Sequence, residues 1–298
     1  MNRIVGTVLA GLLGLAFGSF LNVCLSRWPA GESVVKQRSH CRSCGRTLAL
    51  WENVPLVSWI ALRGRCRTCK AGISWRYPLV ELAVGMLWGL IAWTLLRTTW
   101  PGPPTIYFFE NRYELAGGVG LAVLAWLLLA LAILDAEHLW LPDWLTLPGI
   151  ALGVFITIFR NRLVYEMPGS DIGPPPPLAL GALRCILAVL IAAGLVLLIR
   201  WTYWLIRRRE GIGLGDAKLM AMLGAWLGLS GALLSFAIGV VLGAVFALIL
   251  LAVPAGWRES ETWLTAKLPL GTFLCIGGIV SALWGQPIIN AYMRWAGL

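Results

Sequence analysis

Residues 115–134 read "LAGGVGLAVLAWLLLALAIL", twenty residues without a charged side chain that end directly before Asp135. A helix needs about 20 consecutive apolar residues to cross a bilayer. The composition of the whole chain agrees, because 59% of its 298 residues are hydrophobic and the mean hydropathy is +0.79. Soluble domains of this size are far less apolar. The sequence therefore predicts a protein that crosses the membrane several times.

Seven further apolar runs recur along the chain. Two of them, 144–159 and 217–229, are shorter than a perpendicular crossing requires. We expect an all-α polytopic membrane protein with about eight transmembrane helices. The seven further runs are 4–26, 79–96, 144–159, 179–200, 217–229, 232–253 and 268–284.

The distribution of Lys and Arg predicts the orientation in the membrane. Seventeen of them fall in residues 27–76, 200–218 and 254–267, against six in the segments expected on the other side. Because cytoplasmic loops carry the excess of positive charge, the N-terminus is expected outside and residues 27–76 in the cytoplasm. This bias also accounts for the net charge of +10, so the lipid bilayer is the expected partner and nucleic acid is not.

One segment between the first two apolar runs has the composition of a small folded domain. It is polar and basic, and it carries "CRSCG" at 41–45 and "CRTCK" at 66–70. Two C-x2-C pairs are typical of a tetrahedral metal site, here with Cys41, Cys44, Cys66 and Cys69 as ligands. Four thiolates favour zinc, while an iron site of the same geometry stays open. Two disulfides are disfavoured in a reducing cytoplasm.

Such a site with four protein ligands leaves no open position for a substrate, so the metal is expected to be structural. The organisation predicted for the chain is a first transmembrane helix at 1–27, a cytoplasmic zinc-binding domain at 28–78, and a transmembrane catalytic domain at 79–298.

Three acidic residues lie where apolar runs meet the cytoplasmic face: Asp135, Asp143 and Asp216. Acids at such a depth are costly and mark function more often than not. Two carboxyl groups held close together do not both ionise readily, so one keeps a proton while the other activates water. Such a pair hydrolyses a peptide bond without a metal ion.

The sequence context separates the three acids. Asp143 precedes an apolar run, where an N-cap is the ordinary use of an aspartate. Asp216 has the same position but lies in "GIGLGDAKL" (211–219), whose glycines permit close approach. Asp135 ends a helix, where the dipole gives an acid no capping use. We hypothesise that Asp135 is the more readily protonated and Asp216 the more readily ionised member of a catalytic pair, with support from Gly213, Gly215 and Asp143.

Taken together, these segments resemble the type IV prepilin leader peptidases, the polytopic aspartic proteases of type IV pilus and type II secretion systems. In that family the aspartates at the positions of Asp135 and Asp216 are catalytic, and the cysteines bind zinc. The segments that carry the resemblance are "GSFLNV" (18–23), "RWP" (27–29), the two cysteine pairs, "WENVPLVSW" (51–59), "RYPLVEL" (76–82), "LDAEHLWLPDWLTLP" (134–148), "GIGLGDAKL" (211–219) and "MLGAW" (222–226).

The resemblance also implies a substrate and a second activity. Such enzymes lie in the bacterial inner membrane, cut the leader from prepilins or pseudopilins on the cytoplasmic side, and N-methylate the new terminus with S-adenosylmethionine. The chain has no dinucleotide-type glycine fingerprint in a soluble unit, so methylation rests on the resemblance alone. One departure is "LPLG" (268–271), where the family often has Pro-Phe-Gly.

A different class of function is a noncatalytic membrane scaffold of a pilus or secretion machine, whose zinc domain binds a partner and whose acids only cap helices. The glycines before Asp216 and the position of Asp135 at the end of a helix are features that a scaffold does not need. They favour the enzyme.

Overall fold

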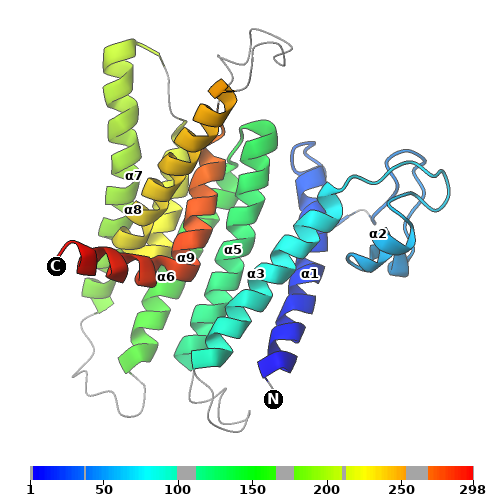
Figure 1. Cartoon of the computed structure of the whole chain (residues 1–298), viewed down its shortest axis with the longest axis horizontal. Coiled ribbons are helices and arrows are strands. Elements are labelled where there is room, and N and C mark those ends of the chain that lie inside the picture. The colour runs from blue at the N-terminus through cyan, green and yellow to red at the C-terminus, as the bar shows by residue number, and fades with distance from the viewer. Residues whose placement is uncertain are drawn as a thin grey trace. The chain divides into compact units, whose positions relative to one another are not determined.

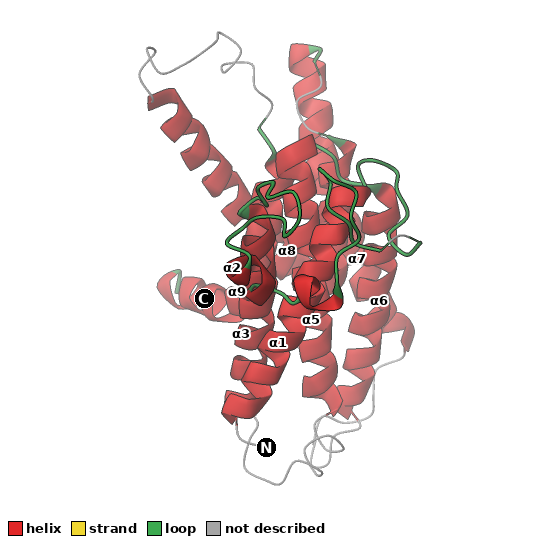
Figure 2. Ribbon diagram, turned by 90° about the vertical axis from the view of Figure 1, so that its right-hand side faces the viewer, coloured by secondary structure: helices red, strands yellow, loops and turns green. Residues whose placement is uncertain are grey.

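The computed structural model describes residues 3–36, 38–98, 112–165, 178–209, 213–252 and 268–297, and this part of the chain forms helices and loops without a β-strand (Figure 2). Seven of its helices are long and apolar enough to cross a membrane, which confirms the predicted all-α membrane fold. They are α1 (Arg3–Arg27), α3 (Arg76–Thr98), α5 (Arg112–His138), α6 (Asp143–Tyr165), α7 (Leu178–Arg207), α8 (Leu214–Ala252) and α9 (Leu270–Trp295).

Helix α8 contains both of the apolar runs that were predicted as separate helices, 217–229 and 232–253. The two parts meet at Gly228, whose φ of 70° and ψ of −178° are not helical. A left-handed φ is open to glycine at little cost, which is why the break falls at this residue. The eight predicted segments are therefore present, with two of them joined across Gly228.

The contacts with α9 show that α8 reverses its direction at this break. The beginnings of α8 and α9 both lie against Leu141, and further along Leu223 lies against Gly278. Beyond the break the order is inverted, because Gly239 lies against Leu274, close to the start of α9. The first part of α8 thus runs parallel to α9 and the second part runs antiparallel to it (Figure 1).

The chain divides into two compact units, Met1–Trp126 and Leu127–Leu298, with the boundary inside α5. In the first unit, α1 and α3 lie side by side (Figure 1). Glycines allow this close approach: a Cβ atom at Gly14 would lie 2.8 Å from the carbonyl oxygen of Val84, and one at Gly18 would lie 2.7 Å from Cα of Glu81. Small residues at helix contacts are the usual means of packing helices in membranes.

Two polar side chains fix the end of α1 and the beginning of α3, one to the other helix and one to the segment between them, which contains η1 (Leu50–Asn53) and α2 (Val57–Ala61). Glu81 is buried, and its Oε2 accepts a hydrogen bond of 2.8 Å from the backbone N–H of Leu56, just before α2. Asn22 is also buried and donates from Nδ2 to the carbonyl oxygen of Tyr77 at 2.9 Å. Buried polar groups need such partners, so these bonds tie α2 to α3 and α3 to α1.

In the second unit the first part of α8 is enclosed by α6 and α7. Trp226 donates from Nε1 to the carbonyl oxygen of Gly149 in α6 at 2.9 Å. On the side of α7, a Cβ atom at Gly224 would lie 2.7 Å from the carbonyl oxygen of Ala188. This enclosure places Asp216, at the beginning of α8, among packed helices. Fully buried leucines fill the interior: Leu128, Leu131, Leu134, Leu219, Leu223 and Leu274.

The packing of α1 on α3 gives a stability prediction. In Gly18→Ala the added methyl group meets the backbone of α3, and overpacking of this kind costs about 1–3 kcal/mol. We expect a lower thermal midpoint for the detergent-solubilised variant, followed by intrinsic tryptophan fluorescence. Gly181→Ala is the matched control, because nothing lies within 4 Å of a Cβ atom there. Equal midpoints for the two variants would contradict the close α1–α3 contact.

Candidate functional site

Asp135 lies in the last turn of α5 and bonds to the first turn of α9. Its side chain is 5% exposed. Its Oδ2 accepts hydrogen bonds from the backbone N–H of Thr272 at 2.7 Å and from Oγ1 of the same residue at 3.1 Å. The carboxylate therefore satisfies a free amide of α9, as an N-cap side chain does, although it comes from a different helix.

This contact corrects one premise of the sequence argument. Asp135 was expected to have no capping use, because it ends a helix. The structure shows that it caps another helix, through Thr272, which lies 137 residues away along the chain. The dipole of α9 directs its positive end at this carboxylate, which favours negative charge there.

Asp216 lies in the first turn of α8 and is 8% exposed. Its Oδ2 accepts a hydrogen bond from the backbone N–H of Gly213 at 3.2 Å, reaching back over the start of the helix as the acid of a capping box does. Gly213 is itself exposed. Gly213, predicted to support the catalytic pair, thus contacts Asp216 through its backbone, while Gly211 lies outside the described residues.

A single side chain, Leu141, joins the surroundings of the two aspartates. It lies against Gly215, where a Cβ atom would be 3.1 Å from its Cβ, and against Gly271, where a Cβ atom would be 3.0 Å from its Cδ1. Gly271 also borders Asp135, since its Cβ atom would lie 2.9 Å from Oδ2. Leu141 therefore contacts a glycine beside each of the two aspartates, and a Cβ atom at either glycine would be crowded. The catalytic pairing of Asp135 with Asp216 stays a prediction.

Asp143 does not join this pair. It is the first residue of α6, its side chain is 60% exposed, and its Oδ1 accepts a hydrogen bond of 2.5 Å from Nζ of Lys218. Lys218 lies two positions after Asp216 in the sequence. The ion pair links the start of α6 to the start of α8. Because it is solvent-exposed, its contribution to stability is small.

Two buried carboxyl groups that interact with each other have a defined chemical capability. Repulsion between the two negative charges opposes ionisation of the second carboxyl group. The pair therefore keeps one proton over a pH range in which a lone carboxyl group is already ionised. The ionised member then accepts a proton from water while the other donates one to a leaving group. The site is thus equipped for hydrolysis by acid and base catalysis.

The four predicted cysteine ligands converge in the first unit. The Sγ atoms of Cys41, Cys44, Cys66 and Cys69 all lie within 4.8 Å of one another, and all four thiols are free. In a tetrahedral site with sulfur at about 2.3 Å from the metal, neighbouring sulfur atoms are about 3.8 Å apart. The Sγ atoms of Cys41 and Cys69 are 3.7 Å apart, so the cluster has the dimensions of a four-thiolate metal site.

Each cysteine pair lies in a tight loop of the same design. An antiparallel bridge closes each loop, between His40 and Thr47 in one and between Arg65 and Gly72 in the other. The backbone N–H groups inside each loop point at its first cysteine. Those of Cys44 and Ser43 lower the pKa of the Cys41 thiol, and those of Cys69 and Thr68 lower the pKa of Cys66 to about 6. Each loop therefore favours the thiolate of its first cysteine, whereas burial and the neighbouring thiols raise the pKa of Cys69 to about 11.

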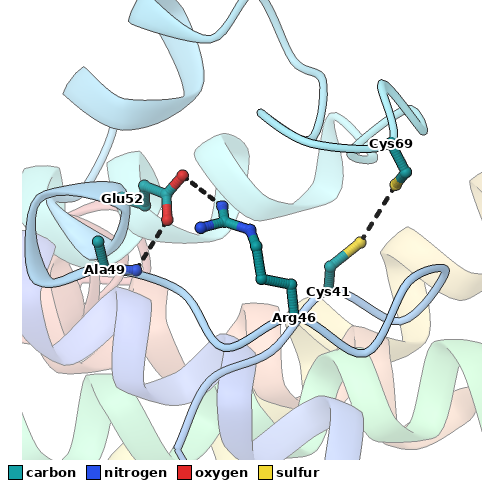
Figure 3. Close-up of polar contacts among 5 residues, drawn as sticks. All are labelled: Cys41, Arg46, Ala49, Glu52 and Cys69. Atoms are coloured by element: carbon teal, nitrogen blue, oxygen red, sulfur yellow. Dashed lines mark hydrogen bonds and ion pairs between the residues drawn. The ribbon is translucent and has the colours of Figure 1, made fainter.

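An ion pair connects the first loop to η1 (Figure 3). Arg46 donates from Nη2 to Oε1 of Glu52 at 2.6 Å, and Oε2 of Glu52 accepts from the backbone N–H of Ala49 at 2.7 Å. The hydrogen bond from Arg46 and then that from Ala49 hold the pKa of the Glu52 carboxyl group below its usual range. The carbonyl oxygen of Arg46 also accepts from the N–H of Cys41, so the pair orients the cysteine loop.

Sequence reasoning missed three residues of the aspartate site: Leu141, Gly271 and Thr272. Leu141 lies between Asp135 and Asp143 in the sequence. No sequence feature distinguishes it from the other leucines of the membrane helices, and only its contacts in the structure do so. Gly271 is the last residue of the "LPLG" segment (268–271). The one signal for it in the sequence was that this segment departs from the Pro-Phe-Gly that the family often has. No pattern near Thr272 indicates a hydrogen bond to a residue so distant in the chain.

Comparisons with known proteins give a consistent result. The family model described as "Bacterial Peptidase A24 N-terminal domain" matches residues 12–95, and the one described as "Type IV leader peptidase family" matches residues 122–248. The first match contains the four cysteines, and the second contains Asp135 and Asp216.

Similar proteins include several that are named prepilin leader peptidase/N-methyltransferase. The one from Stutzerimonas stutzeri is 34% identical, over 100% of this chain and 97% of the relative. That from Pseudomonas aeruginosa is 34% identical over 96% and 93% of the two chains, and that from Myxococcus xanthus is 37% identical over 84% and 65%. No solved structure matches the chain.

The cysteine cluster predicts the metal content of two variants. In Cys66→Ser the purified protein is expected to lose its bound metal, because three thiolates and a hydroxyl group bind a soft ion poorly. Cys185→Ala serves as the control and is expected to keep the metal, since Cys185 is buried in α7. Elemental analysis of the purified variants measures the metal-to-protein ratio. Full metal content in Cys66→Ser would contradict the four-thiolate site.

Proposed function

This chain belongs to the type IV leader peptidase family, and we propose that it removes the leader peptide of a prepilin and then methylates the new N-terminus. Its relatives bear the name prepilin leader peptidase/N-methyltransferase and are 31% to 37% identical. A noncatalytic scaffold would have no use for two buried carboxyl groups whose neighbouring glycines both contact Leu141, and these groups are the observation that carries the proposal.

Asp135 and Asp216 are the catalytic residues in this proposal. Both are nearly inaccessible to solvent. Asp216 lies in the first turn of α8, and Asp135, at the end of α5, contacts the first turn of α9, so each carboxyl group faces a helix N-terminus that favours negative charge. One carboxylate takes a proton from a water molecule, whose oxygen adds to the carbonyl carbon of the scissile bond. The other carboxyl group donates its proton to the leaving nitrogen, so the C–N bond breaks and an amine leaves.

Gly213, Gly215 and Asp143 support this pair from outside. The backbone N–H of Gly213 donates a hydrogen bond to Asp216. Gly215 has no side chain, so the side chain of Leu141 can lie against it. Asp143 holds Lys218, which fixes the first turn of α8 to α6. These contacts orient the loop that leads to Asp216 and take no part in the proton transfers.

Zinc is the metal that we assign to the four cysteines, in a structural role. Four thiolates suit zinc, the site has no position left for water, and its distances fit Zn–S bonds of about 2.3 Å. When bound, the ion would cross-link two loops of a segment that has few buried apolar side chains. Iron is the other ion that the same ligands accept, and elemental analysis distinguishes the two.

S-adenosylmethionine is the methyl donor that we propose for the second activity. The methyl group would pass from the sulfonium of the donor to the nitrogen of the new N-terminus, which loses a proton, and the donor would leave as a thioether. The relatives' names are the support for this step. The product of each reaction has its own mass, so one experiment reports both.

The chain's place in the cell follows from the same proposal. We place it in the bacterial inner membrane with its N-terminus outside and with the zinc-binding domain and both aspartates at the cytoplasmic side, where prepilin or pseudopilin leaders are exposed. The division into a first helix (1–27), a zinc-binding domain (28–78) and a transmembrane peptidase domain (79–298) belongs to this proposal as well. The Lys and Arg distribution supports the orientation.

The catalytic pair is tested by Asp135→Asn and Asp216→Asn. Each is expected to lower the rate of leader removal by at least about a hundredfold, because a neutral amide neither accepts nor donates the proton. The solubilised protein is incubated with a prepilin, with and without S-adenosylmethionine, and the products are weighed by mass spectrometry. Glu114→Gln, the same change at the other end of α5, is the control and is expected to cleave normally.

Cleavage by either aspartate variant at the wild-type rate would reject the pair. If neither the wild type nor the control removed the leader from a competent substrate, the scaffold function would replace the enzyme. A methyl group on the product in the presence of S-adenosylmethionine would confirm the second activity, and an unmethylated product would contradict it.

The glycine at the edge of the site gives a separate prediction. In Gly271→Ala the methyl group would meet Oδ2 of Asp135 and Cδ1 of Leu141, so the carboxylate has to move. We expect kcat to fall about tenfold or more, since a small misplacement of a reacting group is costly. Gly194→Ala in α7 is the control, because a Cβ atom there meets nothing within 4 Å. Equal rates for the two variants would contradict the tight fit around Asp135.

A further inference from the structure

Thr272 makes two different contacts with Asp135, and only one of them depends on its side chain. The backbone N–H donates to Oδ2 at 2.7 Å, a bond that any residue except proline could make. The hydroxyl group lies 3.1 Å from the same Oδ2. It also lies 3.0 Å from the carbonyl oxygen of Ala132, three residues before Asp135 in α5.

These distances place one hydroxyl proton between two acceptors. A threonine hydroxyl has one proton to donate and two lone pairs to accept with. It cannot donate to Asp135 and Ala132 at the same time. Which of them receives the proton depends on the charge of Asp135, because a carboxylate only accepts hydrogen bonds whereas a carboxylic acid also donates one.

We propose that Thr272 is a positioning residue for the catalytic pair, which holds Asp135 as the ionised base and allows it to take up a proton during the reaction. This inference rests on the proposed peptidase activity. When Asp135 is ionised, the hydroxyl group and the N–H both donate to Oδ2. When Asp135 is protonated, the hydroxyl group donates instead to the carbonyl oxygen of Ala132 and accepts a hydrogen bond from the new O–H of the Asp135 carboxyl group. Neither state leaves the hydroxyl proton without an acceptor.

The hydrogen-bond donors around the two carboxyl groups also make Asp216 the proton donor of the pair. Among the residues that the structure describes, its carboxyl group has one backbone donor, Gly213, at 3.2 Å, whereas Oδ2 of Asp135 has two donors on Thr272, the nearer at 2.7 Å. Donors stabilise the charged form of a carboxyl group. The distribution is the reverse of the one hypothesised from the sequence, in which Asp135 kept the proton. The bond from Thr272 is the reason for the reversal.

The proton transfers then balance without another group. Asp135 takes a proton from the attacking water, and the hydroxyl group of Thr272 turns toward Ala132. Asp216 gives its proton to the leaving nitrogen and becomes ionised. Transfer of the proton from Asp135 back to Asp216 restores the starting state, and the hydroxyl group returns to Oδ2. Among the described residues, the other titratable group that interacts with both aspartates is the buried thiol of Cys275 in α9.

The test compares Thr272→Val, which removes the hydroxyl group and keeps the N–H, with Thr272→Ser, which keeps both. For Thr272→Val we expect kcat for leader removal to fall about tenfold with KM unchanged, as is typical for loss of a hydrogen bond to a charged group. The acidic limb of its rate profile should move to higher pH, because the ionised form of the pair has lost a donor. Thr272→Ser should restore both the rate and the profile.

Thr157→Val is the matched control for loss of a threonine hydroxyl. Thr157 donates to the carbonyl oxygen of Ala225 at 2.8 Å, on the α6 side of α8, and its loss should leave the pH profile in place. A wild-type rate and profile in Thr272→Val would overturn the inference, as would equal losses in the valine and serine variants. Asp135→Asn, measured alongside, separates the two claims: if it cleaves, the catalytic pair itself is wrong.

Discussion

The hydrogen bonds from Thr272 to Asp135 join the end of α5 to the beginning of α9, and the arrangement of the site depends on them. A carboxylate in an apolar bundle is costly unless donors surround it. The first turn of α9 supplies those donors from its backbone and its hydroxyl group. In return, the carboxylate satisfies an amide that would otherwise lack a partner at the start of a helix. The carboxylate of Asp135 and the start of α9 therefore stabilise each other.

The second carboxyl group reaches the same place because α8 turns back at Gly228. The first part of α8 stays short and begins at the level where α5 ends and α9 begins, as the shared contacts with Leu141 show. Glycines on α8 and α9 leave the space for that leucine, and α6 and α7 enclose the helix that carries Asp216.

Local features of the sequence predicted much of this structure, and distant contacts account for what they missed. The apolar runs located every long helix, because hydropathy reports burial in lipid directly. The spacing of the cysteines predicted their convergence. By contrast, the bonds of Asp135 to Thr272 join residues that no local pattern relates, and the sequence hypothesis on protonation failed to include them. The sequence predicted a gap at 230–231, whereas the break lies at Gly228, inside the run 217–229, since the place of the reversal depends on how α8 packs against α9.

The pH dependence of a single round of cleavage, with enzyme in excess over prepilin, tests the central claim most directly. Under these conditions the rate reports bond cleavage rather than product release. A pair that works with one carboxyl group ionised and the other protonated gives a bell-shaped profile whose two limbs belong to the pair. The account predicts such a bell, with both limbs changed when either Asp135 or Asp216 is replaced. A rate that rises to a plateau and shows no second limb would contradict it.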